Sequence, residues 1–300
     1  MNSLLTLIRR NVKLFFKDKG MFFSSLITPV ILLVLYGTFL GRVYRENFLS
    51  SMPAGFQLPE SLIDGLVGGQ LISSILAVSC VTVAFCSNML MVQDKVTGAR
   101  RDLMVTPVKR SHLAIGYYAA SLLTTLIVCL VAVGASLCYL SLVGWYLSVG
   151  DVLQLLLDVF LLAMFGTALS SIVNCFLSTE GQISAVGTVV SAGYGFLCGA
   201  YMPVSQFGEG LQRVLAFLPG TYGTGLLRNH ALNGALVEME TQGVPAEVTA
   251  TIRDTLDCNL YFFGHRVGPD AMCLIVSGSV LVLVAIYVGI SVWRGKKAQR

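Results

Sequence analysis

The charged side chains of one short segment, residues 93–110 (QDKVTGARRDLMVTPVKR), interrupt two long apolar runs, 66–92 and 113–143. Its five cations outnumber its two acids: Lys95, Arg100, Arg101, Lys109 and Arg110 against Asp94 and Asp102. The apolar residues of the segment recur at roughly helical spacing, and Pro107 would end such a helix. A short cationic helix between two long apolar runs is suited to binding the surface of a soluble partner protein.

Patterns that carry catalysis or metal binding are missing from the sequence. It has no Gly-x-x-x-x-Gly-Lys-Ser/Thr phosphate loop, no Gly-x-Ser-x-Gly and no His-Glu-x-x-His. The glycine-rich run 220–225 lacks the lysine of a phosphate loop, and the three histidines are far apart in the sequence. We therefore expect no catalytic residue, no metal and no cofactor in this chain, so that any energy it uses comes from a partner or a gradient.

The composition is that of a membrane protein. Of the 300 residues, 55% are hydrophobic and 12% are charged, and the mean hydropathy is +0.76, whereas soluble domains carry about 25% charged residues. Backbone groups in lipid must pair within their own segment, and the apolar runs lack the period-two alternation of barrel strands. The sequence predicts an all-α membrane protein with a single transmembrane domain over residues 1–300. Six cysteines fall inside apolar runs, and whether Cys258 and Cys273 pair stays open.

Six membrane-spanning helices are expected. Their approximate bounds are 21–40, 66–92, 113–143, 152–177, 183–201 and 271–293. Before them, residues 1–20 predict an amphipathic helix that lies in the membrane interface with its cations toward lipid phosphates. Residues 42–65 are expected to form a polar loop.

The longest segment between spans is 202–270. Pro203 ends the fifth span, and the apolar runs on either side of Pro219 are too short to cross a bilayer. The segment therefore predicts an extracellular re-entrant hairpin followed by a soluble helix at about 246–257.

The distribution of cations sets the orientation. Six spans place both termini on the side of the 93–110 segment, and 14 of the 20 Lys and Arg residues fall on that side. The positive-inside rule makes that side cytoplasmic.

The polar and small residues inside the spans allow more than one interpretation of their role. Ser73, Ser79, Thr82 and Asn88 give the second span a polar stripe, which either bonds to a neighbouring helix or lines a substrate path. Asp158 in the fourth span is either a hydrated carboxylate at the membrane interface or a buried carboxylate with a structural or functional role. Close helix packing, including packing between two copies, is expected at three glycines of the fifth span: Gly187, Gly195 and Gly199.

Two motifs in this layout resemble a known family. Residues 97–108 (TGARRDLMVTPV) are similar to the coupling-helix signature of the permease subunits of type-2 ATP-binding-cassette (ABC) exporters, where the family usually opens with a Glu and this chain has Gln93 and Asp94. Residues 199–203 (GAYMP), followed by Leu218-Pro219 and Leu227-Arg228, are similar to the outer hairpin of that family. The resemblance covers essentially the whole chain.

The resemblance implies a mechanism and partners. Two permeases, identical or homologous, would pair across the second and fifth spans in a bacterial cytoplasmic membrane. Two copies of a separate ATPase, which holds ATP and Mg²⁺, would bind the cytoplasmic side and drive outward movement of an amphipathic drug, peptide or lipid-linked substrate. Membrane lipids would also be partners, and nucleic acid would not. The ATPase-coupling residues would be Asp94, Lys95, Thr97, Gly98, Arg100, Arg101, Leu103, Thr106 and Pro107.

Three other functions are compatible with parts of the sequence. An ion-coupled secondary transporter could use Asp158, but the chain lacks a convincing internal repeat. A non-transporting sensor or assembly protein of the same fold would keep the 93–110 segment without needing the polar stripe. An intramembrane enzyme would need catalytic residues that the sequence does not suggest.

Overall fold

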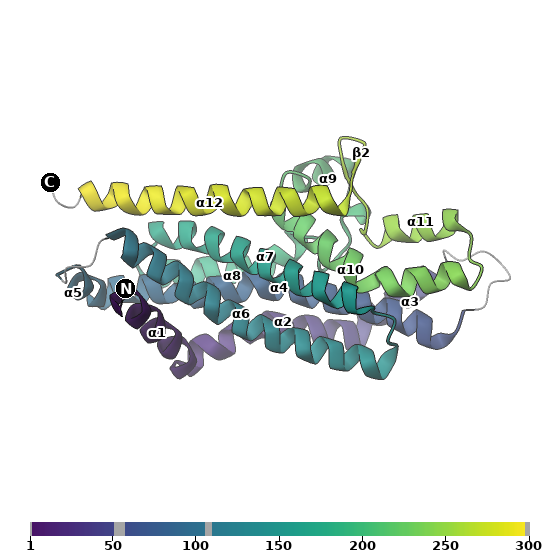
Figure 1. The fold of residues 1–300 in the computed structure, drawn as a ribbon, viewed down its shortest axis with the longest axis horizontal. Coiled ribbons are helices and arrows are strands. Elements are labelled where there is room, and N and C mark those ends of the chain that lie inside the picture. The colour runs from purple at the N-terminus through teal and green to yellow at the C-terminus, as the bar shows by residue number, and fades with distance from the viewer. Residues whose placement is uncertain (1, 51–57, 106–109, 298–300) are drawn as a thin grey trace.

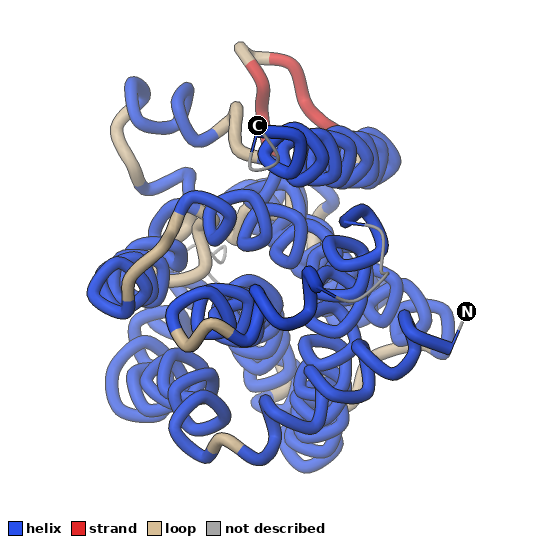
Figure 2. Tube along the Cα trace, turned by 90° about the vertical axis from the view of Figure 1, so that its left-hand side faces the viewer, coloured by secondary structure: helices blue, strands red, loops and turns tan. Residues whose placement is uncertain are grey.

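A computed structural model describes residues 2–50, 58–105 and 110–297. It is 85% helical, and its helices lie side by side in an elongated bundle (Figures 1 and 2). The elements in chain order are α1 (Asn2–Lys17), α2 (Lys19–Leu35), the π-helix η1 (Tyr36–Leu40), α3 (Gly41–Ser50), α4 (Glu60–Val96), α5 (Ala99–Val105), α6 (Arg110–Val143), α7 (Val149–Phe176), α8 (Glu180–Leu197), the 3₁₀-helix η2 (Val204–Gln206), α9 (Glu209–Leu215), α10 (Pro219–Thr241), α11 (Ala246–Thr255), β1 (Leu260–Phe262), β2 (His265–Val267) and α12 (Pro269–Lys297).

Helix α4 is the centre of the bundle. It contacts α2, α6, α7, α8 and α10, and 94% of its most apolar stretch is buried. A helix that is apolar on all sides is expected in the interior of a helix assembly. The other helices of the bundle therefore pack around α4.

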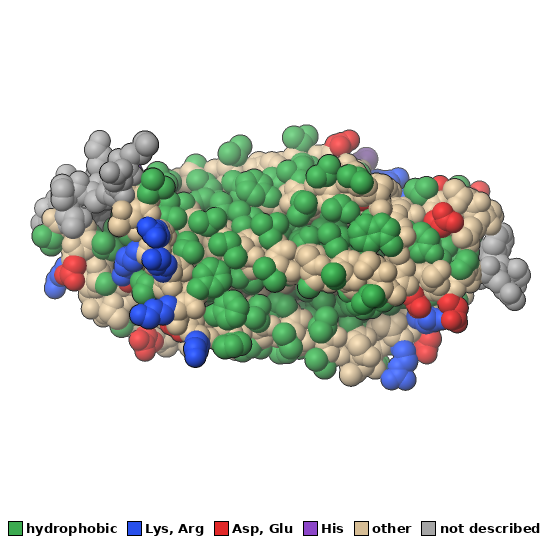
Figure 3. Space-filling view, turned by 60° about the horizontal axis from the view of Figure 1, so that its bottom comes forward, with side chains coloured by type: hydrophobic (Ala, Val, Ile, Leu, Met, Phe, Trp, Pro, Cys, Tyr) green, Lys and Arg blue, Asp and Glu red, His purple; other side chains and the backbone are tan. Residues whose placement is uncertain are grey.

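On the face drawn in Figure 3, apolar side chains form a belt across the middle of the bundle, and charged side chains gather toward its two ends. Five helical segments are long and apolar enough to cross a membrane: Lys19–Glu46, Glu60–Val96, Ser111–Val143, Val149–Phe176 and Pro269–Trp293. These features confirm an all-α membrane protein. Helix α8, which corresponds to the expected fifth span, is not among the five, so the six-span count stays a prediction.

Three segments that are distant in sequence lie at the same end of the bundle. Helix α1, helix α5 and the C-terminal part of α12 all lie there, which we call the α5 end (Figure 1). The opposite end carries α3 and α11 and is called the α11 end. Helix α1 packs against α6, and its buried residues Leu7 and Phe15 share apolar clusters with Leu113 and Val128 of α6. The expected N-terminal helix is present, and its buried face lies on protein.

The expected polar loop at residues 42–65 is wrong over much of its length. The first spanning helix continues through η1 and α3 to Ser50, and α4 begins at Glu60. Arg45 on α3 pairs with Glu60 at 3.2 Å and with Asp64 at 2.6 Å. The charged residues of this region lie on helices that project beyond the apolar belt, and charge alone did not distinguish a solvated helix from a loop.

The segment after α8 is mostly helical. Helix α10 packs against α4, α7 and α12, and α11 follows close to its predicted place. The sequence did not indicate the antiparallel pair β1–β2, in which Leu260 faces Val267, because each strand has only three residues. The re-entrant hairpin stays a prediction. All eight cysteines, including Cys258 and Cys273, are free thiols.

Candidate functional site

The predicted coupling segment forms a short exposed helix attached directly to α4. Helix α4 ends at Val96, the hydroxyl of Thr97 donates to the Gln93 carbonyl at 2.9 Å, and Gly98 turns the chain with φ +84°. None of the residues of α5 is buried. A side chain at Gly98 would be strained, because L-residues rarely adopt positive φ. The segment is thus two helices joined at Gly98.

Asp94 ties the base of α5 to two other helices. Its carboxylate accepts from Arg10 Nη1 at 2.7 Å and Nη2 at 2.9 Å, and from the Tyr117 hydroxyl at 2.6 Å. The hydrogen bond to Asp94 raises the pKa of Arg10, and such a bidentate pair is stronger than a neutral hydrogen bond. One side chain of α4 therefore holds α1 and α6 beside α5.

Lys95 attaches the same end of α4 to α7. Its Nζ donates to the carbonyl oxygens of Asn174 at 2.7 Å, Cys175 at 3.1 Å and Leu177 at 2.9 Å. The last carbonyls of a helix lack partners within the helix and carry partial negative charge, so a lysine ammonium stabilises them. Lys95 therefore connects α4 with α7 and is not itself part of the exposed face.

The two arginines of α5 border the same cavity but differ in exposure. Arg100 is half-buried and lines a cavity of about 470 Å³ together with Tyr117 and Tyr287. Arg101 is exposed, and Leu103 is half-buried against the core. Thr106 and Pro107 lie outside the described residues. The exposed cations at this end make it suited to an acidic protein surface.

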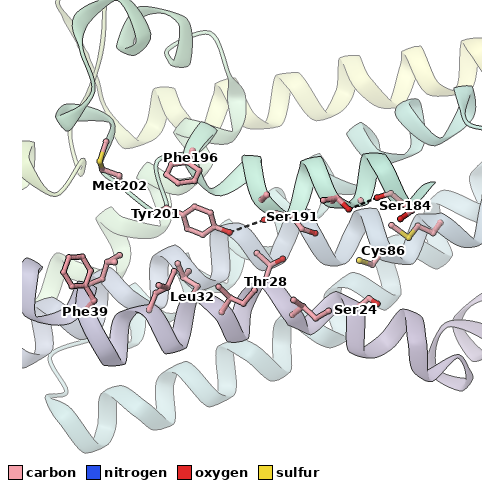
Figure 4. Close-up of a pocket in the computed structure, with 18 of the residues that line it drawn as sticks. Ser24, Thr28, Leu32, Phe39, Cys86, Ser184, Ser191, Phe196, Tyr201 and Met202 are labelled. Atoms are coloured by element: carbon pink, nitrogen blue, oxygen red, sulfur yellow. Dashed lines mark hydrogen bonds between the residues drawn. The ribbon is translucent and has the colours of Figure 1, made fainter. Parts of the chain in front are cut away.

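A groove of about 1100 Å³ runs along α4 between α2 and α8 (Figure 4). Its wall on the α2 side includes Ser24, Thr28, Leu32 and Phe39, its floor includes Cys86, and its wall on the α8 side includes Ser184, Ser191 and Phe196. Tyr201 closes part of one end and donates its hydroxyl to the Ser191 carbonyl at 3.2 Å. Among the described lining residues Glu180 is the one that carries a charge. The groove can accommodate an elongated molecule with an apolar body and a few polar groups.

The polar stripe of the second span lies elsewhere. Ser73, Ser79, Thr82 and Asn88 are all buried and none is among the groove-lining residues. The three hydroxyls donate to carbonyls of their own helix, and Asn88 donates to two serine hydroxyls of α7. In this conformation they bond within the bundle, and their place in a substrate path stays a prediction.

The three glycines of the fifth span have different surroundings. Gly187 lines the groove, where an added Cβ would meet only the mobile end of Met89, at 2.7 Å. A Cβ at Gly195 would lie 2.4 Å from the ring of Tyr201, and Gly199 has φ +76°. A side chain at Gly195 would collide with Tyr201, and one at Gly199 would be strained by the positive φ, so both glycines are explained by contacts within one chain. Packing between two copies stays a prediction.

Sequence reasoning missed two features of these sites. Arg10 was read only as part of a lipid-facing cationic face, although it pairs with Asp94, 84 residues away. The first spanning helix forms one wall of the groove, which its apolar run alone does not indicate. Both depend on contacts distant in sequence, and the only local signal was the cation-rich polar face of residues 1–20.

Comparison with known proteins gives one match. The family described as ABC-2 type transporter matches residues 2–231. Curated proteins and solved structures gave no match. The family match covers α1 through most of α10, and therefore both the α5 region and the groove. The chain belongs to the ABC-2 type transporter family and is the permease component of an ABC transporter, a class that works with an ABC ATPase subunit.

Proposed function

We propose that this permease exports an amphipathic substrate through the groove between α2 and α8, driven by a separate ATPase that contacts α5 and α1. The observation that carries the proposal is the direct attachment of the exposed helix α5 to the buried central helix α4 through Gly98. Packed helices move as rigid units because interiors resist continuous deformation. A force on α5 therefore reaches the floor of the groove.

The side-chain bonds at the base of α5 support this route. The Arg10–Asp94–Tyr117 contacts and the three carbonyl bonds of Lys95 connect α4 with α1, α6 and α7. A partner that displaces α5 would move these helix ends together. The cations at the α5 end, where α1 and the C-terminal part of α12 also lie, support a cytoplasmic location of this end by the positive-inside rule.

The lining of the groove supports an amphipathic substrate. Its walls are apolar with scattered hydroxyls, and Glu180 is its one charged group among the described residues. A lipid-linked pyrophosphate would need cations to offset its charge, which this lining does not offer. The groove therefore favours a neutral or cationic drug-like molecule or peptide over a lipid-linked pyrophosphate.

A complete path requires a second permease and two ATPases. The groove is open along one side of the protomer, and α8 would act as the sixth spanning helix beside it. Pairing of two permeases, identical or homologous, would enclose two grooves in one space. ATP and Mg²⁺ would be held by the ATPases, whose closure would switch the path from inward-facing to outward-facing.

The test compares two glycines with the same backbone conformation. Gly98 has φ +84° and Gly243, after α10 at the other end of the bundle, has φ +90°; neither has a heavy atom within 4 Å of an added Cβ. In the complex purified with its ATPase, we expect Gly98→Trp to uncouple ATP hydrolysis from transport and Gly243→Trp to leave coupling intact. Wild-type coupling in Gly98→Trp, or in a charge reversal of Lys95, Arg100 and Arg101, would show that α5 does not transmit the force.

A further inference from the structure

A fully buried arginine joins three segments near one end of the groove. Arg228 on α10 is 1% exposed. It donates from Nη1 to Asp257 Oδ2 at 3.0 Å and from Nη2 to the Gly199 carbonyl. The side-chain oxygen of Gln70 on α4, turned toward the guanidinium, accepts from Nε at 3.1 Å and from Nη2 at 3.2 Å. One guanidinium therefore links α4, the turn after α8 and the turn after α11.

Asp257 completes the connection from the other side. Its carboxylate accepts from the backbone N–H of Val204 and from that of Ser205 at 3.0 Å, and the residue is 2% exposed. Its φ of +55° lies in the left-handed region, which Asp and Asn tolerate better than other non-glycine residues. Separating a buried ion pair leaves an uncompensated charge and is strongly unfavourable. The pair with Arg228 is therefore expected to stay intact while the protein works.

The segment held in this way is one rim of the groove. Residues 199–206, which we call the rim segment, include Tyr201, Met202, Pro203 and Gln206, and these four line the groove (Figure 4). Because α10 packs broadly on α4 and α7, the rim segment is tied to the centre of the bundle.

The opposite wall is joined to the rim side by apolar packing: Tyr36 of η1 and Tyr44 of α3 are buried in one hydrophobic cluster with residues of α10, and Tyr201 packs against that cluster. Helices α2 and α3 and the π-helix η1 make their main contacts with one another, with α4 and with α1. No side chain of this wall donates to or accepts from the rim segment among the described hydrogen bonds. A π-helical turn within a longer helix is frequent at functional sites, and η1 lies at the level of the rim, where Phe39 and Leu40 line the groove.

We propose that Arg228 and Asp257 are positioning residues that hold the rim segment as one rigid body with α10, so that the groove opens by displacement of the α2–α3 wall. The role in transport rests on the function proposed above, whereas the rigidity of the rim segment does not. The rim then defines a fixed edge past which the substrate leaves, and the moving edge is the helix that contains η1.

Spin-label distances in the reconstituted transporter test the direction of opening. One label pair, at Gln206 and Glu240, lies within the proposed rigid body, and a second pair, at Gln206 and Arg42, crosses the groove; all three positions are exposed. Alanine at Cys138 and Cys273 removes the less buried native thiols. Between nucleotide-free and ATP-bound states we expect the crossing distance to shift by several ångströms, about the size of a one-turn helix displacement, with the within-body distance unchanged. A within-body shift as large as the crossing shift would overturn the proposal.

A substitution in the permease alone tests the positioning role without any ATPase. Asp257→Asn keeps the shape and the tolerance for positive φ but removes the charge that faces Arg228. We expect it to broaden the Gln206–Glu240 distance distribution, whereas Glu247→Gln, an exposed change on α11, leaves that distribution as in the wild type. An unchanged distribution in Asp257→Asn would overturn the positioning role. If Asp257→Asn does not fold, the two label distances in the wild type still test whether the rim segment is rigid. If neither distance changes on ATP binding, that result counts against the proposed function instead.

Discussion

Arg10 and Asp94 form a two-point ion pair, with nitrogen–oxygen distances of 2.7 and 2.9 Å, between the first helix of the chain and the end of the central helix. The Asp94 side chain is 6% exposed and that of Arg10 is 32% exposed. Tyr117 donates to the same carboxylate. The pair therefore fixes α1 to the point where α4 meets α5, and it gives α1 a structural role beyond contact with lipid.

Removal of this carboxylate should destabilise the permease. Asp94→Ala leaves Arg10 and the Tyr117 hydroxyl without their acceptor, and we expect a loss of about 3 kcal/mol in the free energy of unfolding. Chemical unfolding in detergent measures it. Asp102→Ala is the matched control, because Asp102 is exposed on α5 and its loss should cost less than about 0.5 kcal/mol. Equal effects of the two substitutions would contradict the network.

Substitutions at Asp158 distinguish an ATP-driven exporter from an ion-coupled transporter. The structure places it 4% exposed, with His230 Nδ1 on α10 at 2.5 Å from its Oδ2. Asp158→Asn keeps an oxygen that accepts from the ring, so we expect ATP-driven transport within about twofold of wild type. Asp158→Leu leaves the ring nitrogen without that partner and should cost about 1–3 kcal/mol of stability. A folded Asp158→Asn protein that loses transport would favour a proton-coupled mechanism.

Occlusion of the groove should block transport. Gly187 lines the groove, so the indole of Gly187→Trp would occupy it, and we expect at least about a tenfold loss in uptake of an amphipathic fluorescent dye into inside-out vesicles. Gly193→Trp is the control on the same helix, because Gly193 has open space around an added Cβ and does not line the groove. If both variants transport the dye equally well, the groove is not the path.

Thiol labelling tests the packing of the turn after α11. Burial raises the pKa of the Cys258 thiol to about 12, above the ordinary value of about 8.5. The reactive thiolate is therefore scarce at pH 7.5, and its fraction grows only as the pH approaches the raised pKa. We expect maleimide to leave Cys258 unmodified in the folded protein and to label it after denaturation, as read by peptide mass spectrometry. Rapid labelling of the folded protein, or a linked Cys258–Cys273 peptide without reductant, would contradict this.

The sequence was sufficient for features that depend on local pattern. Helix α1, the exposed helix after α4 and α11 were all predicted near their observed places, because apolar periodicity together with Pro107 and Pro245 marks them. The candidate spans follow from long apolar runs in the same way.

Features that depend on distant contacts were not predictable. Helix α4 is almost entirely buried, so the direction in which Ser73 or Asn88 points depends on which helices surround it. Gly195 suggested a contact between two copies by its spacing, and the structure shows that Tyr201 of the same chain already fills that space. The partners of Arg10 and Arg228 lie 84 and 29 residues away along the chain.

Site-specific photocrosslinking at α5 tests the central claim most directly. A photoreactive residue at Arg101, which is exposed on α5, is compared with one at Arg266, which is exposed on β2. In the assembled transporter we predict that position 101 crosslinks to the ATPase subunit, that ATP changes the yield, and that position 266 does not crosslink to it. Crosslinking of the ATPase to position 266, or of position 101 to lipid alone, would contradict the account.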